Sequence, residues 1–243
     1  MKFAIIGCNS EDAITFPHHT EVVTTPYGNA RVIHATLPNG KEVDFLTRHS
    51  ICLQEDAYET NFRANIFALY LCGVTHIVSI SVMGTCDYSF RLGSFCLVSD
   101  FIDFTKLRES SFRMEHRLVR HAGMDDVFDG RMTGALEEVI LGEKIPYEGR
   151  VNYACVDGPR HETAAEARMM RALDAQVIGS TLVPEAPLCR EVCIKYASIG
   201  IIARYATGMD QDVTDEDLLR ISAQHKGRAL DVALKAIENY TKL

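Results

Sequence analysis

Three short segments of this chain carry the residue types that bind phosphate, and each follows an apolar run. Residues 7–10 read Gly-Cys-Asn-Ser, a glycine turn whose backbone amides lie beside the side chains of Asn9 and Ser10. Arg48 and His49 follow the second run, and an arginine fork fits two phosphate oxygens at once. Ser81 ends the third run, three residues before a glycine that would let a ligand approach closely. Each segment is also typical of an ordinary turn, a solvated loop or a plain strand exit.

Two later segments have the residue types that would hold a sugar and a planar ring. Residues 157–163 read Asp-Gly-Pro-Arg-His-Glu-Thr, a strong turn signal in which the ring of His161 is able to stack on a ligand. Ser180 and Thr181 stand where a strand ends and a helix begins, and such hydroxyls can face anionic or sugar oxygens. A rigid turn explains the first segment almost as well, and helix capping explains the second.

Strand-like and helical segments alternate along the chain, which favours a largely parallel sheet covered on both faces. We expect one α/β domain over residues 1–243, with a mixed, mostly parallel central sheet flanked by helices. In such sheets ligands bind at the carboxyl ends of strands, where the five segments fall. The expected strands are 3–6, 31–37, 43–46, 76–81, 95–99, 151–155, 176–178 and 197–203. The expected helices are 61–71, 134–141, 163–173, 184–193 and one that starts at Thr214.

Composition excludes several classes of function. The formal net charge of −8 suits neither nucleic acid nor an anionic membrane, so a bound anion needs local positive charge. No apolar stretch reaches membrane-spanning length, and the first residues read as a strand rather than a signal peptide. The eight cysteines include no C-x-x-C pair and mostly lie in apolar runs. We expect reduced, buried thiols and a cytoplasmic protein.

The order of these segments resembles the purine nucleoside phosphorylase and methylthioadenosine phosphorylase family, in its homotrimeric branch. The specific stretches are Asn-Phe-Arg-Ala-Asn at 61–65 and Gly-Pro-Arg-His-Glu-Thr at 158–163, followed by Val-Pro-Glu at 183–185. The resemblance implies a nucleoside phosphorylase-like fold and the cleavage of a purine nucleoside by phosphate. It also implies a homotrimer that uses inorganic phosphate as co-substrate, with no metal and no organic cofactor.

The resemblance also implies residue roles. Ser180 would lie near the ribose, and the purine would sit between His161 and the strand end at 203–205. His121 matches a histidine of the family's central loop. Phosphate would be held by Asn9, Ser10, Arg48, His49, Ser81 and Thr181.

The sequence departs from the family pattern at the expected site. Family members usually carry a glycine-rich first loop where this chain has Asn9 and Ser10, and a methionine where it has Ser180. Arg204 occupies the place of a base-recognising Asp or Asn. As a pure donor, Arg204 would favour an acceptor at position 6 of the purine and would be the catalytic residue that stabilises the anionic base, unless it is a salt-bridged arginine that points away. Asp215 is either an N-terminal helix charge or a reader of an unusual 5′ group.

Three functions stay open on the sequence. The first is phosphorolysis of a 6-oxopurine nucleoside or of a 5′-modified one, such as a methylthio-nucleoside. The second is methylthioadenosine phosphorylase activity proper. The third is binding of a nucleoside or another ligand by a catalytically weak or inactive homologue, which the altered phosphate loop and Arg204 leave open.

Overall fold

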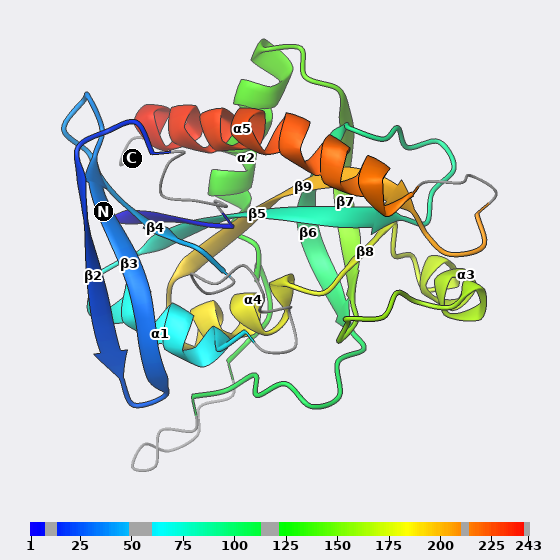
Figure 1. Ribbon diagram of the computed structural model, residues 1–243, viewed down its shortest axis with the longest axis horizontal. Helices are drawn as coiled ribbons and strands as arrows, with labels where there is room; N and C mark the ends of the chain where they lie inside the picture. Colours follow the sequence, from blue (N-terminus) through cyan, green and yellow to red (C-terminus); the bar gives the residue numbers. More distant parts are fainter. Residues whose placement is uncertain (8–13, 49–59, 113–121, 210–213, 241–243) are drawn as a thin grey trace.

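The strands form a single curved sheet. The computed structural model describes residues 1–7, 14–48, 60–112, 122–209 and 214–240 (Figure 1). Within them the sheet has nine strands in the order β2-β3-β4-β1-β5-β8-β7-β6-β9. The strands are β1 (Phe3–Ile6), β2 (His18–Thr25), β3 (Gly28–Thr36), β4 (Glu42–Leu46), β5 (His76–Thr85), β6 (Phe95–Asp103), β7 (Tyr147–Cys155), β8 (Val177–Gly179) and β9 (Lys195–Tyr205).

The pairing is mixed, as the sequence predicts. Parallel pairs join β1 to β4 and β5, β5 to β9, and β7 to β6 and β8. The remaining pairs, which join β3 to β2 and β4, β5 to β8, and β6 to β9, are antiparallel. Because β9 pairs with both β6 and β5, one half of the sheet closes on itself. The buried strands β1 and β5 are nearly continuous apolar runs, which is how the sequence reveals them.

Helices cover both faces of this sheet (Figure 1). Helices α2 and α5 pack on one face against β5 and β9, and α1 and α4 lie on the other, against β3 and β9. Each face has its own apolar core, with Leu136 and Val232 in one and Ile66 and Leu188 in the other. The helices are α1 (Phe62–Leu71), α2 (Gly130–Gly142), α3 (Ala164–Ala172), α4 (Leu182–Glu191) and α5 (Asp215–Asn239). No helix in the described part of the chain is both long and apolar enough to cross a membrane.

Local sequence signals explain where several helices begin. Thr163 caps α3 and forms a capping box with Glu166, and Thr214 caps α5 and pairs in the same way with Asp217. All five predicted helices and all eight predicted strands are present, with shifted ends. Strand β2 was not predicted, because this edge strand is largely exposed and lacks an apolar run.

A register shift in β9 affects the side chains at its end. Met83 of β5 lies opposite Ile202, but the next residue, Gly84, lies opposite Arg204. Ala203 is therefore the extra residue of a β-bulge, and a bulge changes the direction of the side chains that follow it. The bulge places Arg204 against the backbone of Gly84.

Candidate active site

The carboxyl ends of β1, β4 and β5 meet around Gly7. This glycine has φ of 96°, and a Cβ atom there would collide with the carbonyl oxygen of Ile80 and lie 2.9 Å from Nη1 of Arg48. Only glycine fits this contact without strain. The loop after β1 therefore begins directly above Arg48 and the middle of β5. Asn9 and Ser10, the predicted phosphate ligands of this loop, lie outside the described residues, as does His49.

Arg48 is buried in a network of acceptors. Its Nε and Nη2 donate to the two carboxylate oxygens of Glu185, at 2.5 and 3.2 Å. Nη2 also donates to Ser79 Oγ at 2.6 Å, and Nη1 donates to the Ile80 carbonyl at 3.1 Å. Burial opposes the charge of Arg48, but the Glu185 carboxylate outweighs it and raises the pKa of the guanidinium. Among the described residues, this leaves one N–H of Nη1 for any further acceptor.

The hydroxyls of Ser81 and Thr181, both predicted to bind phosphate, lie within hydrogen-bond distance of each other. Ser81 Oγ on β5 and Thr181 Oγ1 after β8 lie 3.0 Å apart, although they are 100 residues apart in the chain. Thr181 precedes α4, but its side chain makes no capping hydrogen bond, so capping does not explain its hydroxyl. The Thr181 backbone amide donates to the phenol oxygen of buried Tyr153 at 3.1 Å, which fixes the turn.

Arg108, which sequence reasoning missed, joins the two loops that carry the predicted sugar and base ligands. Its Nη1 donates to the carbonyls of Ser180 and Val183, at 2.5 and 2.6 Å, and its Nη2 donates to the Asp157 carbonyl at 2.6 Å. The side chain is only 5% exposed. In sequence it stands in a charged loop, where an arginine normally reads as solvated. The contact holds Ser180 beside Gly158, where an added Cβ would lie 3.7 Å from the Ser180 Cβ.

Arg204 is paired with a carboxylate that had no assigned role. Its Nη1 and Nη2 donate to Oε1 and Oε2 of Glu162 at 2.8 and 2.7 Å, and Nη1 also donates to the Tyr205 carbonyl at 3.2 Å. Glu162 accepts a third bond, from the Thr207 amide at 3.0 Å. Burial opposes ionisation of Glu162, but the bonds from Arg204 outweigh it and lower the carboxyl pKa. Arg204 is thus salt-bridged at the end of β9, with its side chain 14% exposed.

The remaining predicted ligands are less closely tied to this cluster. His161 is exposed on the loop between β7 and α3, next to Glu162, and Ser180 is half-buried. Asp215 is the first residue of α5, and its side chain lies outside the described residues, as does His121. The structure therefore brings Gly7, Arg48, Ser81 and Thr181 together at one end. Ser180, Glu162 and Arg204 continue from them along the same edge of the sheet.

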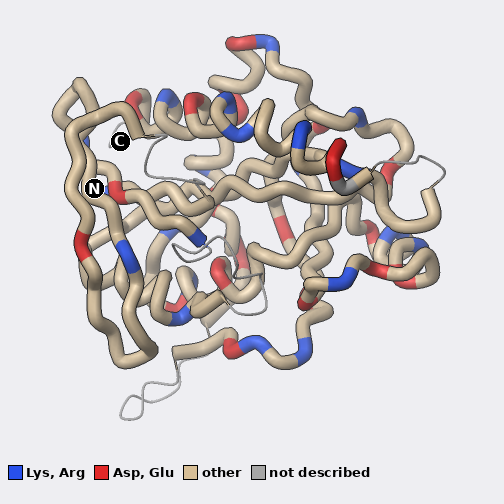
Figure 2. The backbone as a smooth tube through the Cα atoms, in the orientation of Figure 1, with Lys and Arg blue, Asp and Glu red and all other residues tan. Residues whose placement is uncertain are grey.

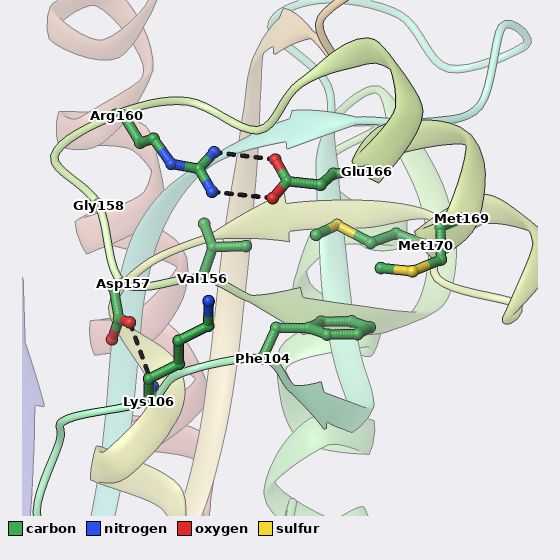
Figure 3. Close-up of a pocket in the computed structure, with 9 residues that line it drawn as sticks. All are labelled: Phe104, Lys106, Val156, Asp157, Gly158, Arg160, Glu166, Met169 and Met170. Carbon is green, nitrogen blue, oxygen red and sulfur yellow. Dashed lines mark hydrogen bonds and ion pairs between the residues drawn. The ribbon is translucent and has the colours of Figure 1, made fainter.

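A hollow of about 460 Å³ lies beside the loop between β7 and α3 (Figure 3). Its walls come from Phe104 and Lys106 after β6, from residues 156–158 after β7, and from Met169 and Met170 on α3. Arg160 and Glu166 close it with two hydrogen bonds of 2.8 Å. None of the predicted ligands lines this hollow. It adjoins the candidate site only through the loop between β7 and α3.

The mixed sheet, flanked by helices, carries a glycine turn, two converging hydroxyls and two arginines at its strand ends, an arrangement typical of α/β enzymes that bind ligands at this edge. The chain belongs to the Phosphorylase superfamily, whose profile matches residues 2–238. Lys and Arg are interspersed among Asp and Glu along the described backbone of this acidic chain (Figure 2).

Relatives named for two different activities resemble the chain to a similar degree. A probable 6-oxopurine nucleoside phosphorylase of Thermococcus kodakarensis is 33% identical, over 99% of this chain and 93% of that protein. An S-methyl-5′-thioadenosine phosphorylase of Pyrococcus furiosus is 32% identical, over 97% of this chain and 91% of that protein. The crystal structure of a methylthioadenosine phosphorylase from an antarctic soil metagenomic library superposes with a TM-score of 0.88. Its sequence is 29% identical to this chain, and the match covers 99% of this chain and 88% of that one.

Proposed function

We propose that this protein cleaves the glycosidic bond of a purine nucleoside with inorganic phosphate, giving a free purine and a ribose 1-phosphate. The observation that carries the proposal is the meeting of the Ser81 and Thr181 hydroxyls, 3.0 Å apart, at the carboxyl ends of the sheet. Neither hydroxyl is used for capping, and both lie beside a glycine turn in a member of the Phosphorylase superfamily. Paired hydroxyls with backbone amides suit phosphate oxygens.

The charges of the reaction fit this arrangement. Breaking the bond puts positive charge on the sugar and negative charge on the leaving purine. Phosphate held near Ser81 and Thr181 would stabilise the sugar and then attack its anomeric carbon. The developing charge on the purine needs a donor at the other end of the substrate. Arg204 is the donor that we assign to this role, although Glu162 balances its charge and it is not a general acid at neutral pH.

Arg48 supports the phosphate site mainly by holding the residues that surround it in place. Most of its donors already serve Glu185, Ser79 and Ile80. We propose that its remaining Nη1 N–H contributes one bond to phosphate beside Gly7, with Asn9, Ser10 and His49 completing the site. The reaction needs no metal or organic cofactor, so dialysis against a chelator should leave the rate unchanged.

The test is a panel of adenosine, inosine, guanosine, methylthioadenosine and methylthioinosine, each with and without phosphate. We expect phosphate-dependent loss of at least one nucleoside, together with ribose 1-phosphate or its methylthio form. Preference within the panel separates a 6-oxopurine enzyme from a methylthioadenosine phosphorylase. It also shows whether Asp215 accompanies an unusual 5′ group.

A second function is favoured by one observation, the neutralisation of Arg48 by Glu185. If that pair keeps phosphate out, the protein binds a nucleoside without cleaving it. Calorimetric binding of a nucleoside, combined with no turnover at any phosphate concentration, would establish this alternative and exclude phosphorolysis.

We also propose a cytoplasmic homotrimer that acts in purine salvage. The six described cysteines are free, and burial raises the pKa of both Cys86 and Cys96 to about 12, which suits inert thiols in a reducing compartment. Small-angle scattering tests the assembly. A monomer that is fully active would exclude a site shared between subunits.

A further inference from the structure

The peptide group between Ser180 and Thr181 is held from both sides by buried side chains. Its carbonyl accepts a hydrogen bond from Nη1 of Arg108 at 2.5 Å, and its N–H donates to the phenol oxygen of Tyr153 at 3.1 Å. Because this peptide is trans, its C=O and N–H point in opposite directions, and the two bonds restrain it from opposite sides. The orientation of the peptide plane is therefore fixed.

Both supporting side chains are themselves held in place. Tyr153 is fully buried, and a Cβ atom at Gly179 would lie 2.5 Å from its hydroxyl, so the phenol rests on the backbone of β8. The Arg108 side chain is only 5% exposed. Its guanidinium lies over the ring of Phe62, with 5.2 Å between Cζ and the ring centroid.

Arg108 also ties this peptide to two neighbouring stretches of chain. The second N–H of Nη1 donates to the Val183 carbonyl, and Nη2 donates to the Asp157 carbonyl, each at 2.6 Å. Its Nε lies 3.5 Å from the Asp157 carboxylate, which also accepts from the Lys106 amide at 3.1 Å. The donors of a guanidinium lie in one fixed plane, so a single arginine serves three carbonyls at once, which a lysine ammonium cannot do in the same geometry.

The fixed peptide determines where the Thr181 hydroxyl lies. The backbone at Thr181 has φ of −121° and ψ of −31°, and a β-branched side chain has few rotamers open to it on a given backbone. In the rotamer observed, Oγ1 lies 3.0 Å from Ser81 Oγ. A rotation of the 180–181 plane would therefore move one of the two hydroxyls that we assign to phosphate.

We propose that Arg108 is a positioning residue for phosphate binding, which acts through the 180–181 peptide to hold the Thr181 hydroxyl beside Ser81. This inference rests on the proposed function and adds a residue that does not itself contact phosphate. Within the described part of the chain, the hydrogen bonds of the Arg108 side chain all go to backbone carbonyls. Its effect on phosphate therefore passes through the backbone that it holds.

The test is a double-mutant cycle of Arg108→Met and Thr181→Val. Binding of inorganic phosphate is measured by calorimetry, and kcat and the KM for phosphate are measured with the nucleoside that is cleaved fastest. We expect each single substitution to weaken phosphate binding about tenfold, the loss expected for one hydrogen bond to a charged group. If Arg108 acts through Thr181, the double variant should also be about tenfold weaker than the parent, whereas independent effects would multiply to about a hundredfold.

Arg108→Lys separates the geometry of this contact from its charge. Lysine keeps the positive charge, but it lacks the planar fork that reaches both loops. We expect Arg108→Lys to weaken phosphate binding nearly as much as Arg108→Met does. If Arg108→Lys binds phosphate as tightly as the parent while Arg108→Met does not, the effect is attraction at a distance and the inference is overturned.

The matched control is Arg190→Met. Arg190 also donates to a backbone carbonyl, that of Gly123 at 2.7 Å, but it lies at the opposite end of α4 from Thr181, so phosphate affinity should not change. The inference is overturned if Arg108→Met binds phosphate as the parent does, or if its effect and that of Thr181→Val multiply to about a hundredfold. If Arg108→Met does not fold, the same cycle with Arg108→Lys decides the outcome.

Failure of the proposed function would look different. If the parent binds phosphate and the cycle shows the coupling, but no nucleoside is cleaved, phosphorolysis is excluded and the positioning role stands. If a nucleoside is cleaved and the two substitutions act independently, phosphorolysis stands and the positioning role is excluded. A parent that binds no phosphate would exclude both.

Discussion

Arg48 and Glu185 form a buried ion pair in which Nε lies 2.5 Å from Oε1, with side chains 5% and 2% exposed. The pair joins the segment after β4 to helix α4, and Tyr196 donates to the same carboxylate at 2.6 Å. It therefore sits beneath the candidate phosphate site and supports it.

Removing one partner of this pair should destabilise the fold. We expect Arg48→Ala to lose about 3–5 kcal/mol of unfolding free energy, because Glu185 is left buried without its cation. Urea denaturation measures the change. Arg160→Ala, which removes an exposed pair with Glu166, is the control and should leave the urea midpoint nearly unchanged. Equal effects of the two substitutions would show that Glu185 finds another partner.

The two hydroxyls near Gly7 should set the affinity for phosphate. We expect Ser81→Ala and Thr181→Val each to raise the KM for phosphate about tenfold or more, the loss expected for one hydrogen bond to a charged group. The KM for nucleoside should change less. Ser198→Ala removes a buried hydroxyl without a partner on the neighbouring strand β9, and it should change neither constant. An unmoved phosphate KM in both site variants would place phosphate elsewhere.

The Glu162–Arg204 pair should contribute a pH-dependent part of the stability. The folded-state pKa of Glu162 lies below its ordinary value of 4.5, so this contribution is complete above about pH 4.5 and is lost as the pH falls through the folded pKa. The unfolding free energy of Glu162→Gln, measured in urea between pH 3 and 7, should fall less steeply below pH 4.5 than that of the parent. Parallel curves would mean that the pKa of Glu162 is the same in the folded and unfolded protein.

Gly84 should be required for the position of Arg204. An alanine Cβ would fall 2.9 Å from Cζ, so Gly84→Ala must push the guanidinium away from β5. We expect a loss of about 1–3 kcal/mol of unfolding free energy, the usual cost of overpacking a buried site, and urea denaturation measures the change. Gly134→Ala in α2 is the control, because an added Cβ there meets nothing within 4 Å and alanine favours the helix.

The sequence was most informative where structure is local. Buried strands such as β1 and β5 are continuous apolar runs, and the capping boxes of Thr163 and Thr214 use partners three residues away. The order of motifs was enough to identify the family, and it placed Ser81 and Thr181 at strand ends that prove to meet. The exposed edge strand β2 has no such pattern, and it was missed for that reason.

The partners of the charged side chains were decided only by the tertiary structure. Arg48 and Glu185 are 137 residues apart, and Glu162 and Arg204 are 42 apart, so nothing local to either residue specifies the pair. Sheet order brings the first pair together. The bulge at Ala203 and the close approach of Gly84 bring the second together. The sequence alone determined that an arginine stands at the end of β9, and the fold decided which edge of it stays unpaired, because Glu162 and the Tyr205 carbonyl occupy the others.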